Sequence, residues 1–329
     1  MKNRRSPRML AATLLLAFPL LAGCQSYLDP SVPVAIRPVM EPEFQQQYLL
    51  YRPSNYDRNM AWPLVVVCAA GFGDSPDQQI RDWTQLAERN GFLAVAPPVR
   101  GNRPGMFTKS ADASAALQED ERRILATIRH VQAAYTVSDD RIFIYGWAGG
   151  AQAALYTGLR HPEWFRAVAV FQPKIDADAL VDARRGVDSQ QAVLVYTNAT
   201  DAIWGHPAGE CVTWLRNAGA DVTEDPTGPA RRTDGARAVD FFDRVIRNRP
   251  WIHVVATSPD PKKPAEFRFA VRSSFAPTAM RWRFGDGSEA TVVEPVHVYS
   301  KPGSYRVELE LRDAQGKTHE RATEVTVRP

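Results

Sequence analysis

The ten residues Arg141-Ile-Phe-Ile-Tyr-Gly-Trp-Ala-Gly-Gly150 decide the fold of this chain. Residues 142–145 form a short apolar run, which predicts a buried β-strand. A tight turn flanked by glycines follows, and the small residues 151–159 after it predict a helix that packs closely on the strand. A strand, a tight turn and a helix in direct succession predict one unit of an α/β sheet.

The same alternation continues on both sides of this unit. Strands are predicted at residues 43–52, 64–67, 92–96, 165–171 and 192–196, and helices at residues 78–90, 116–134, 207–218 and 235–248. Strands that alternate with amphipathic helices indicate a doubly wound, mostly parallel sheet. Ligands of such sheets bind at the carboxyl ends of the strands, where we expect Ala148, Asp201 and the loop 68–75.

The turn Gly146-Trp-Ala-Gly-Gly150 has the spacing of a nucleophile elbow, Gly-x-Ser-x-Gly, with alanine in the central place. Because a methyl group can neither attack a carbonyl carbon nor lose a proton, Ala148 has no nucleophilic chemistry. The backbone N–H of Gly149 is retained at the predicted helix start, and such groups bind anions and oxyanions in other proteins.

Residues 43–248 resemble the α/β-hydrolase superfamily, and most closely the esterases related to polyhydroxybutyrate depolymerases and feruloyl esterases. The segments that carry the resemblance are Tyr48-Leu-Leu-Tyr-Arg-Pro-Ser-Asn-Tyr-Asp57, Pro63-Leu-Val-Val-Val67, Asp139-Asp-Arg-Ile-Phe-Ile-Tyr-Gly146 and Pro162-Glu-Trp-Phe-Arg-Ala167. The resemblance implies an α/β-hydrolase-like fold. It also implies an attacking serine, a histidine that moves its proton, a carboxylate that orients the histidine, and N–H groups that hold the oxyanion.

Two of these catalytic parts are missing at the matching positions. The serine position is Ala148, and residues 222–236, where the resemblance places the histidine, contain none. Ala69-Ala70 stand where the family usually carries His-Gly. The carboxylate position is Asp201, which is equally well explained as a turn or helix-capping residue. The absence of both the serine and the histidine indicates a natural domain that no longer catalyses hydrolysis, because a catalytic triad acts as a unit.

A relocated catalytic site is the rival interpretation. Ser75, Ser110 and Ser114 are its candidate nucleophiles, and His206 lies near Asp201 in the sequence. In the alternative interpretation, the serines are loop or helix-cap residues and His206 only begins a helix.

Aromatic side chains are expected around the mouth of the site. The candidates for a ligand cleft are Phe72, Trp147, Trp204 and His206. A neighbouring loop adds Arg100 and Arg103, and aromatic rings beside charges suit a sugar or peptide ligand. The alternative, which we favour, is that Trp147 and Trp204 fill the volume that a substrate would occupy.

The pattern of the sequence changes near residue 250, where we place a domain boundary between 43–249 and 250–329. Strict alternation of apolar and polar residues replaces the helical periods, which predicts a small all-β sandwich. Residues 252–329 resemble a PKD domain, which implies an immunoglobulin-like sandwich. The segments that carry the resemblance are Trp282-Arg-Phe-Gly-Asp-Gly-Ser288, Pro295-Val-His-Val-Tyr299, Pro302-Gly-Ser-Tyr-Arg-Val-Glu-Leu309 and Asp313-Ala-Gln-Gly316. The resemblance implies contact with an envelope protein or a polysaccharide, or simple spacing.

Residues 1–23 predict a lipoprotein signal peptide. A basic start and a short apolar core end in Leu21-Ala-Gly-Cys24, which resembles the lipobox of bacterial lipoproteins, in which the cysteine is lipidated. A soluble secreted protein with a chance cysteine is the alternative. Gln25 and Ser26 follow Cys24, and the absence of aspartate there resembles sorting to the outer membrane. Residues 24–42 contain four prolines and are predicted to be a tether.

Charge and cysteine content narrow the function classes. Removing residues 1–23 takes away four basic residues and no acidic one, so the formal charge falls from +3 to −1 and gives no indication of nucleic-acid binding. Cys68 and Cys211 are predicted to be buried and unpaired, and no spacing indicates a metal or another cofactor. The sequence therefore predicts a lipid-anchored envelope protein that binds or scaffolds without catalysis. An active esterase with relocated residues and a structural spacer are the alternatives.

Overall fold

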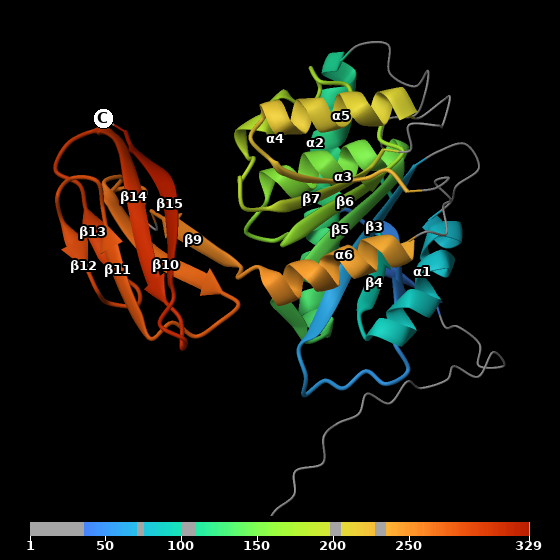
Figure 1. The fold of residues 1–329 in the computed structure, drawn as a ribbon, viewed down its shortest axis with the longest axis horizontal. Coiled ribbons are helices and arrows are strands. Elements are labelled where there is room, and N and C mark those ends of the chain that lie inside the picture. The colour runs from blue at the N-terminus through green and yellow to red at the C-terminus, as the bar shows by residue number, and fades with distance from the viewer. Residues whose placement is uncertain are drawn as a thin grey trace, which may run out of the picture.

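The computed structural model describes residues 36–70, 76–100, 110–197, 205–227, 235–258 and 260–328. These residues form two domains in succession (Figure 1). A larger α/β domain extends to helix α6 (Gly235–Asn248), and a smaller all-β domain begins at strand β9 (Ile252–Thr257). The predicted fold class, a mostly parallel sheet followed by a small sandwich, is confirmed.

The described part of the larger domain holds an eight-stranded sheet in the order β1-β2-β4-β3-β5-β6-β7-β8. Its strands are β1 (Ile36–Glu41), β2 (Gln46–Tyr51), β3 (Trp62–Ala70), β4 (Leu93–Ala96), β5 (Val137–Ala148), β6 (Ala167–Phe171), β7 (Ala192–Tyr196) and β8 (Asp221–Asp225). β3 to β8 run parallel, whereas β1 and β2 join antiparallel. The carboxyl ends of β5, β6 and β7 therefore lie side by side, where ligands of such sheets bind.

Helices cover both faces of this sheet (Figure 1). α1 (Pro76–Asn90) and α6 pack on one face. The helices on the other face are α2 (Ser110–Ala134), α3 (Gly149–Arg160), α4 (Val181–Arg185) and α5 (Gly205–Asn217). Within the described residues, no helix is long and apolar enough to cross a membrane.

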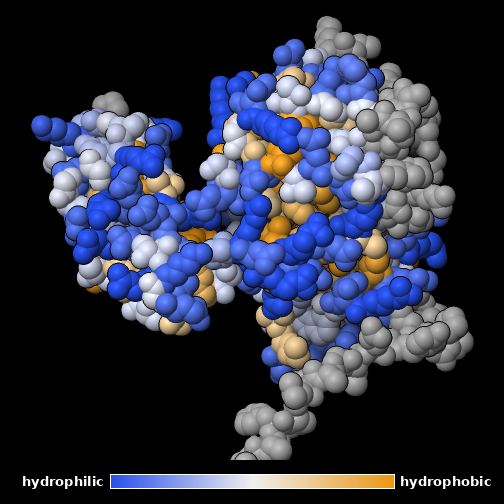
Figure 2. All heavy atoms as spheres, in the orientation of Figure 1, coloured by the Kyte–Doolittle hydropathy of each residue, from blue (hydrophilic) through white to orange (hydrophobic). Residues whose placement is uncertain are grey.

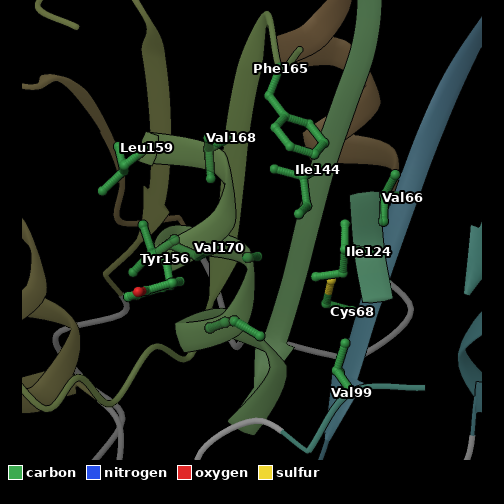
Figure 3. Close-up of a cluster of buried hydrophobic side chains, with 14 of the residues drawn as sticks. Val66, Cys68, Val99, Ile124, Ile144, Tyr156, Leu159, Phe165, Val168 and Val170 are labelled. Carbon is green, nitrogen blue, oxygen red and sulfur yellow. The ribbon is translucent and has the colours of Figure 1, made fainter. Parts of the chain in front are cut away.

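The core beneath α3 explains why the central strands are apolar throughout (Figure 3). Tyr156 and Leu159 of the helix pack against Ile144 of β5 and Val168 of β6, and each is at most 1 % exposed. Because neighbouring residues on a strand face opposite sides, a strand covered on both faces needs apolar residues at every position. Cys68 belongs to this core and is unpaired, as predicted.

The expected tether 24–42 is wrong for its last residues, because Ile36–Glu41 forms the edge strand β1. Pro38 lies within this strand, opposite Leu49 of β2. An edge strand tolerates proline because its outer side makes no ladder hydrogen bonds. The Glu41 carboxylate accepts a hydrogen bond of 2.8 Å from the N–H of Phe44, which fixes the turn into β2.

The second domain is a sandwich of a three-stranded sheet, β13-β10-β9, and a four-stranded sheet, β12-β11-β14-β15, in the described residues. Its further strands are β10 (Glu266–Ser273), β11 (Ala279–Arg283), β12 (Glu289–Ala290), β13 (Val296–Val298), β14 (Gly303–Arg312) and β15 (Thr318–Val327). Trp282 and Phe269 are fully buried between the sheets. Gly285 and Gly287 have φ of 82° and 93°, values that favour glycine in the predicted turn.

A buried arginine fixes the point where the second domain begins. The guanidinium of Arg166 donates hydrogen bonds to the carbonyl oxygens of Arg249 (2.6 Å) and Ile246 (3.2 Å) at the end of α6. It also donates to the carbonyl oxygen of Asp140 (3.1 Å) at the start of β5. These bonds satisfy terminal helix carbonyls and tie α6 to the sheet directly before β9.

A cleft of about 670 Å³ separates the two domains. The loop 185–190 of the α/β domain forms one wall, and residues of β14 and β15 form the other. Figure 2 shows mostly hydrophilic surface on both sides of it. The cleft is therefore a polar, solvent-open feature between the domains.

Candidate functional site

The turn after β5 keeps the backbone of a nucleophile elbow. β5 ends at Ala148 and α3 begins at Gly149, so the chain changes direction within one residue. Ala148 has φ 47° and ψ −117°, a conformation that residues with a Cβ rarely adopt. Such a strained strand-to-helix turn lifts a nucleophile out of an α/β sheet. Here it holds a half-buried methyl group.

Small residues around the elbow are required by packing alone. A Cβ at Gly146 would lie 2.6 Å from the Cα of Ala151 and 2.7 Å from the Cβ of Ala154. A Cβ at Gly158, near the end of α3, would lie 2.6 Å from a methyl carbon of Val168. The glycines therefore let α3 lie directly on the sheet, whatever chemistry the turn performs.

Three aromatic rings cross the carboxyl edge of the sheet on the side opposite α3. Trp147, Phe171 and Tyr196 are the aromatic row, and they stand at or next to the last positions of β5, β6 and β7. Ring centroids are 4.7 Å apart for Trp147 and Phe171 and 3.9 Å apart for Phe171 and Tyr196. All three are at most 8 % exposed. The row therefore fills space beside the elbow with packed rings.

A charged cluster continues the aromatic row at the end of β8. The guanidinium of Arg237, in the first turn of α6, lies 4.4 Å from the ring centre of Tyr196. It donates from Nε to the carboxylate of Asp225 (2.8 Å) and from Nη2 to the hydroxyl of Thr227 (2.8 Å). Burial alone would raise the pKa of Asp225, but the hydrogen bonds from Arg237 and Thr227 outweigh it and lower the pKa.

Two family models match this chain. Residues 48–211 match the Dienelactone hydrolase family, and residues 248–327 match the PKD domain. The chain joins an α/β-hydrolase domain to a PKD domain. The hydrolase match contains the elbow, and the PKD match contains both sheets of the sandwich, so the two predicted resemblances are confirmed at this level.

The similar proteins match only parts of this chain. A ferulic acid esterase from Anaeromyces mucronatus is 15 % identical, with a TM-score of 0.49, over 67 % of this chain and 93 % of its own. A putative dienelactone hydrolase from Klebsiella pneumoniae is 20 % identical, with a TM-score of 0.43, over 66 % of this chain and 96 % of its own. The collagenase ColA of Bacillus cereus is 47 % identical over 47 residues, which are 14 % of this chain and 5 % of the collagenase.

The predicted site residues have different outcomes. Trp147 belongs to the aromatic row, so little of its ring is open to a ligand. His206 is the second residue of α5, its side chain is 84 % exposed, and its Nδ1 lies 3.6 Å from the carboxylate of Glu210. Ala148 and Gly149 lie at the elbow as predicted. The residues that fall outside the described ranges are Cys24, Phe72, Ser75, Arg103, Asp201 and Trp204.

Sequence reasoning missed four residues of this region, Phe171, Tyr196, Asp225 and Arg237. One available signal is that two successive predicted strands end in an aromatic residue. In a parallel sheet those ends are neighbours, which predicts contact between the rings. Asp225 and Arg237 gave no comparable signal, because their pairing depends on β8, which was not predicted.

All six histidines lie in the described residues, and each contacts side chains there. Within those residues, Ser110 and Ser114 of α2 make no hydrogen bond to a histidine. The ring contacts are His130 with Tyr48, His161 with Glu121 and Glu163, His206 with Glu210, His253 with Trp251, His297 with Asp286 and Ser288, and His319 with Asp313.

One histidine does meet a serine and a carboxylate, but in the wrong geometry. In the PKD domain, Nε2 of His297 lies 2.8 Å from Asp286 and 3.4 Å from Ser288, so one nitrogen serves both contacts. A triad needs two nitrogens, one for the nucleophile and one for the carboxylate. The Ser288 hydroxyl donates to Asp286 instead, at 2.5 Å. The His297 and Phe284 rings stack with their centroids 4.3 Å apart, which indicates that His297 has a structural role in this turn.

His161 is held between two carboxylates at the end of α3. Its Nε2 lies 2.8 Å from Glu121 of α2, and its Nδ1 lies 2.8 Å from Glu163. Arg160 donates to the same oxygen of Glu121 at 2.6 Å. Burial alone would lower the pKa of His161, but the bonds to both carboxylates outweigh it and raise the pKa to about 9. Because both of its ring nitrogens are hydrogen-bonded to carboxylates, the His161 imidazolium has no free nitrogen for catalysis. It joins α2 to the end of α3 instead.

The pKa of His161 predicts a pH dependence of stability. An unfolded histidine has a pKa of 6.5, so the stabilisation is complete below pH 6.5 and is lost as pH rises towards 9. Allowing for solvent screening, we expect a loss of about 2 kcal/mol across this window. Urea unfolding of wild type and His161→Gln at several pH values measures it. The difference in unfolding free energy should shrink with rising pH; a constant difference contradicts the assigned ion pairs.

Proposed function

We propose that this chain is a non-catalytic binding or scaffolding protein of the cell envelope. The observation that carries the proposal is Ala148, a methyl group held at φ 47° in the place of a nucleophile. A non-glycine residue in this conformation costs free energy, about 1–3 kcal/mol. The strained turn thus persists in a chain that lacks the oxygen the turn would present.

The histidines support the same proposal. Residues 222–236 contain none, and the six in the chain contact the partners given above. Removing a single triad member lowers catalysis by several orders of magnitude, and here two positions differ together. Restoring the serine alone therefore leaves it without a base.

The aromatic row and the Arg237–Asp225 pair fill the side of the elbow where a hydrolase would bind its substrate. They therefore support a binding role at another place on the protein. The cleft between the domains is the better place for a ligand, since its walls carry charged side chains from both domains. The loop 185–190 contributes Arg185 and Asp188, and the PKD domain contributes Arg283 and Glu310. Such walls suit a polar ligand, a polysaccharide or an envelope protein.

Placement in the envelope rests on two supports. The tetrad ending in Cys24 has the pattern of a lipidation site, which gives an anchor in the outer membrane. The PKD domain match, and the similarity to a stretch of a Bacillus cereus collagenase, favour an exported protein. Globomycin treatment of expressing cells tests the anchor: an accumulating unprocessed precursor supports it, and processing unaffected by the drug contradicts it.

The catalytic part of the proposal predicts no ester turnover. Wild type and Ala148→Ser should both hydrolyse short acyl esters at the background rate, the second because its new hydroxyl finds no histidine. An active feruloyl esterase run in parallel controls the assay. Saturable turnover by wild type would refute the non-catalytic proposal, and turnover by Ala148→Ser alone would show that a base lies within reach of the elbow.

A further inference from the structure

Three buried polar atoms at the junction of the two domains have no hydrogen-bond partner among the described residues. They are Nε of Arg166, Oε1 of Gln191 and Nη1 of Arg321. Arg166 and Gln191 belong to the hydrolase domain and are 5 % and 4 % exposed, whereas Arg321 belongs to β15 of the PKD domain. Buried polar atoms are as a rule paired with protein groups or with ordered water, so these three indicate a further bound group.

All three residues line one small pocket between the domains. Arg166 and Gln191 lie side by side at its hydrolase wall, because they directly precede Ala167 and Ala192, which are register partners in β6 and β7. Arg321 lines the same pocket from the PKD domain. The pocket has a volume of about 20 Å³. About 10–15 Å³ is enough to admit one water molecule.

The other hydrogen bonds of Gln191 determine which of its amide atoms is left for the pocket. Its Nε2 donates to the carbonyl oxygens of Gly158 (2.8 Å) and Phe165 (2.7 Å). Both partners are acceptors, so the amide nitrogen must face them and the amide cannot be turned over. Oε1 is therefore an acceptor, whereas the guanidinium groups of Arg166 and Arg321 can only donate. The pocket thus offers two donors and one acceptor.

We propose that one water molecule binds in this pocket and links the two domains in one orientation. Its oxygen accepts from Nε of Arg166 and from Nη1 of Arg321, and one of its hydrogens is donated to Oε1 of Gln191. Asp188, which also lines the pocket, offers a carboxylate for the second hydrogen. These four partners complete the tetrahedral hydrogen bonding of a water molecule.

The chemistry of the pocket selects water over the other small occupants. A chloride ion would accept from both guanidinium groups, but it would also face the Oε1 oxygen of Gln191 and the carboxylate of Asp188, which repel an anion. A metal cation would face two guanidinium groups, which carry positive charge and offer no lone pair. An empty pocket is typical of apolar walls, and these walls are polar. Water alone both accepts and donates at this size.

The backbone between the domains is already fixed on both sides of this site. The carbonyl oxygen of Arg249 accepts from Arg166, as described above. The N–H of Trp251 donates to Oγ of Ser274 (3.0 Å), and the carbonyl oxygen of Trp251 accepts from the N–H of Ser274 (2.9 Å). The chain that joins α6 to β9 (Figure 1) is thus bonded to the hydrolase domain before Pro250 and to the PKD domain after it.

The water adds a second link beside this backbone connection, so we expect the cleft between the domains to have a fixed width before any ligand enters. This consequence for a ligand rests on the proposed binding role of the cleft. The water link itself does not, and it is tested below without a ligand.

A crystal structure of the full chain tests the binding site. We expect one water oxygen within about 3.2 Å of Nε of Arg166, Nη1 of Arg321 and Oε1 of Gln191. A pocket without solvent density would overturn the proposal. A bromide ion found there by anomalous scattering after a soak in sodium bromide would also overturn it, because it would identify an anion site.

Distance measurements between two spin labels test the link between the domains. Val181→Cys in α4 and Val296→Cys in β13 place the labels at exposed positions of the two domains. Cys24→Ser removes one further reactive thiol, and Cys68 and Cys211 are buried. We expect a single narrow distribution of distances between the labels.

Arg321→Gln in the labelled chain removes the proposed link. Glutamine places an amide nitrogen where Nε stands, so a donor to the Ile252 carbonyl (2.8 Å) remains while Nη1 is lost. We expect the narrow distribution to be lost. Arg306→Gln is the matched control, because Nε of this exposed arginine bonds to Glu308 of its own domain (3.1 Å), and it should keep the narrow distribution.

Two results of the label measurement would overturn the proposal. One is a broad distribution in the labelled chain without further substitution, which would show that the domains are not held in one orientation. The other is an Arg321→Gln distribution as narrow as that of the Arg306→Gln control. An unchanged far-ultraviolet circular dichroism spectrum verifies that each variant is folded.

Discussion

Gly146→Ala is expected to destabilise the hydrolase domain by about 3 kcal/mol. The new methyl carbon would lie 2.6 Å from the Cα of Ala151 and 2.8 Å from the carbonyl oxygen of Gly150. These are backbone atoms, which cannot rotate away as the end of a flexible side chain does. α3 would therefore have to move off β5 in a closely packed interior. Urea unfolding followed by far-ultraviolet circular dichroism measures the loss.

Gly209→Ala is the matched control for this substitution. Gly209 lies in α5, and a Cβ there would meet nothing within 4 Å. Alanine at an open helix position is expected to raise stability by about 0.5–1 kcal/mol, because glycine loses more backbone entropy on folding. A Gly146→Ala protein that unfolds at the wild-type urea concentration would show that the close approach of α3 is not required.

Trp282→Ala is expected to cost the PKD domain about 4 kcal/mol. The ring is fully buried, its centroid lies 5.8 Å from that of Phe269, and its Nε1 donates to the Val292 carbonyl. The substitution leaves a cavity and removes the hydrogen bond to the Val292 carbonyl. A small domain has little stability to lose, so its thermal transition should fall by more than about 15 °C in calorimetry.

Trp282→Phe separates the two contributions. Phenylalanine keeps most of the apolar volume and removes the hydrogen bond, which is expected to cost about 1–2 kcal/mol. The transition of the hydrolase domain should change little in either variant, because its cores share no residue with that of the PKD domain. A shift of both transitions by the same amount would contradict two separate cores.

The central strands and helices could be predicted from the sequence because their signals are local. Residues 192–196 are apolar at every position and form β7 within the predicted bounds. Alternation of residues 305–312 predicted the inward side of β14, where Val307, Leu309 and Leu311 are buried. In both strands the pattern of apolar residues along the sequence matches the pattern of buried residues in the structure.

The edges of the sheet could not be predicted in the same way. β1 contains Pro38, an exposed Arg37 and a buried Glu41, and β8 reads Asp-Val-Thr-Glu-Asp, with no buried residue. Edge strands are half-solvated and gain their order from the neighbouring strand, so their own composition carries little signal. The register of β1 with β2 is a tertiary property.

The elbow was predictable and its surroundings were not. Ala148 and Gly149 follow from a motif of fixed spacing, and the strained φ of Ala148 agrees with it. The stacking of Trp147 on Phe171 joins two strands, and the contact of Arg237 with Asp225 joins α6 to β8. Such contacts depend on strand order, which sequence spacing does not specify.

Fluorophosphonate labelling of the intact chain, read by mass spectrometry, tests the central claim most directly. The reagent forms a covalent bond only with a serine whose proton a base removes. We predict an unchanged mass for wild type under conditions in which an active feruloyl esterase is labelled to completion. A stoichiometric adduct that maps to one serine would contradict the account, because it would identify an activated nucleophile outside position 148.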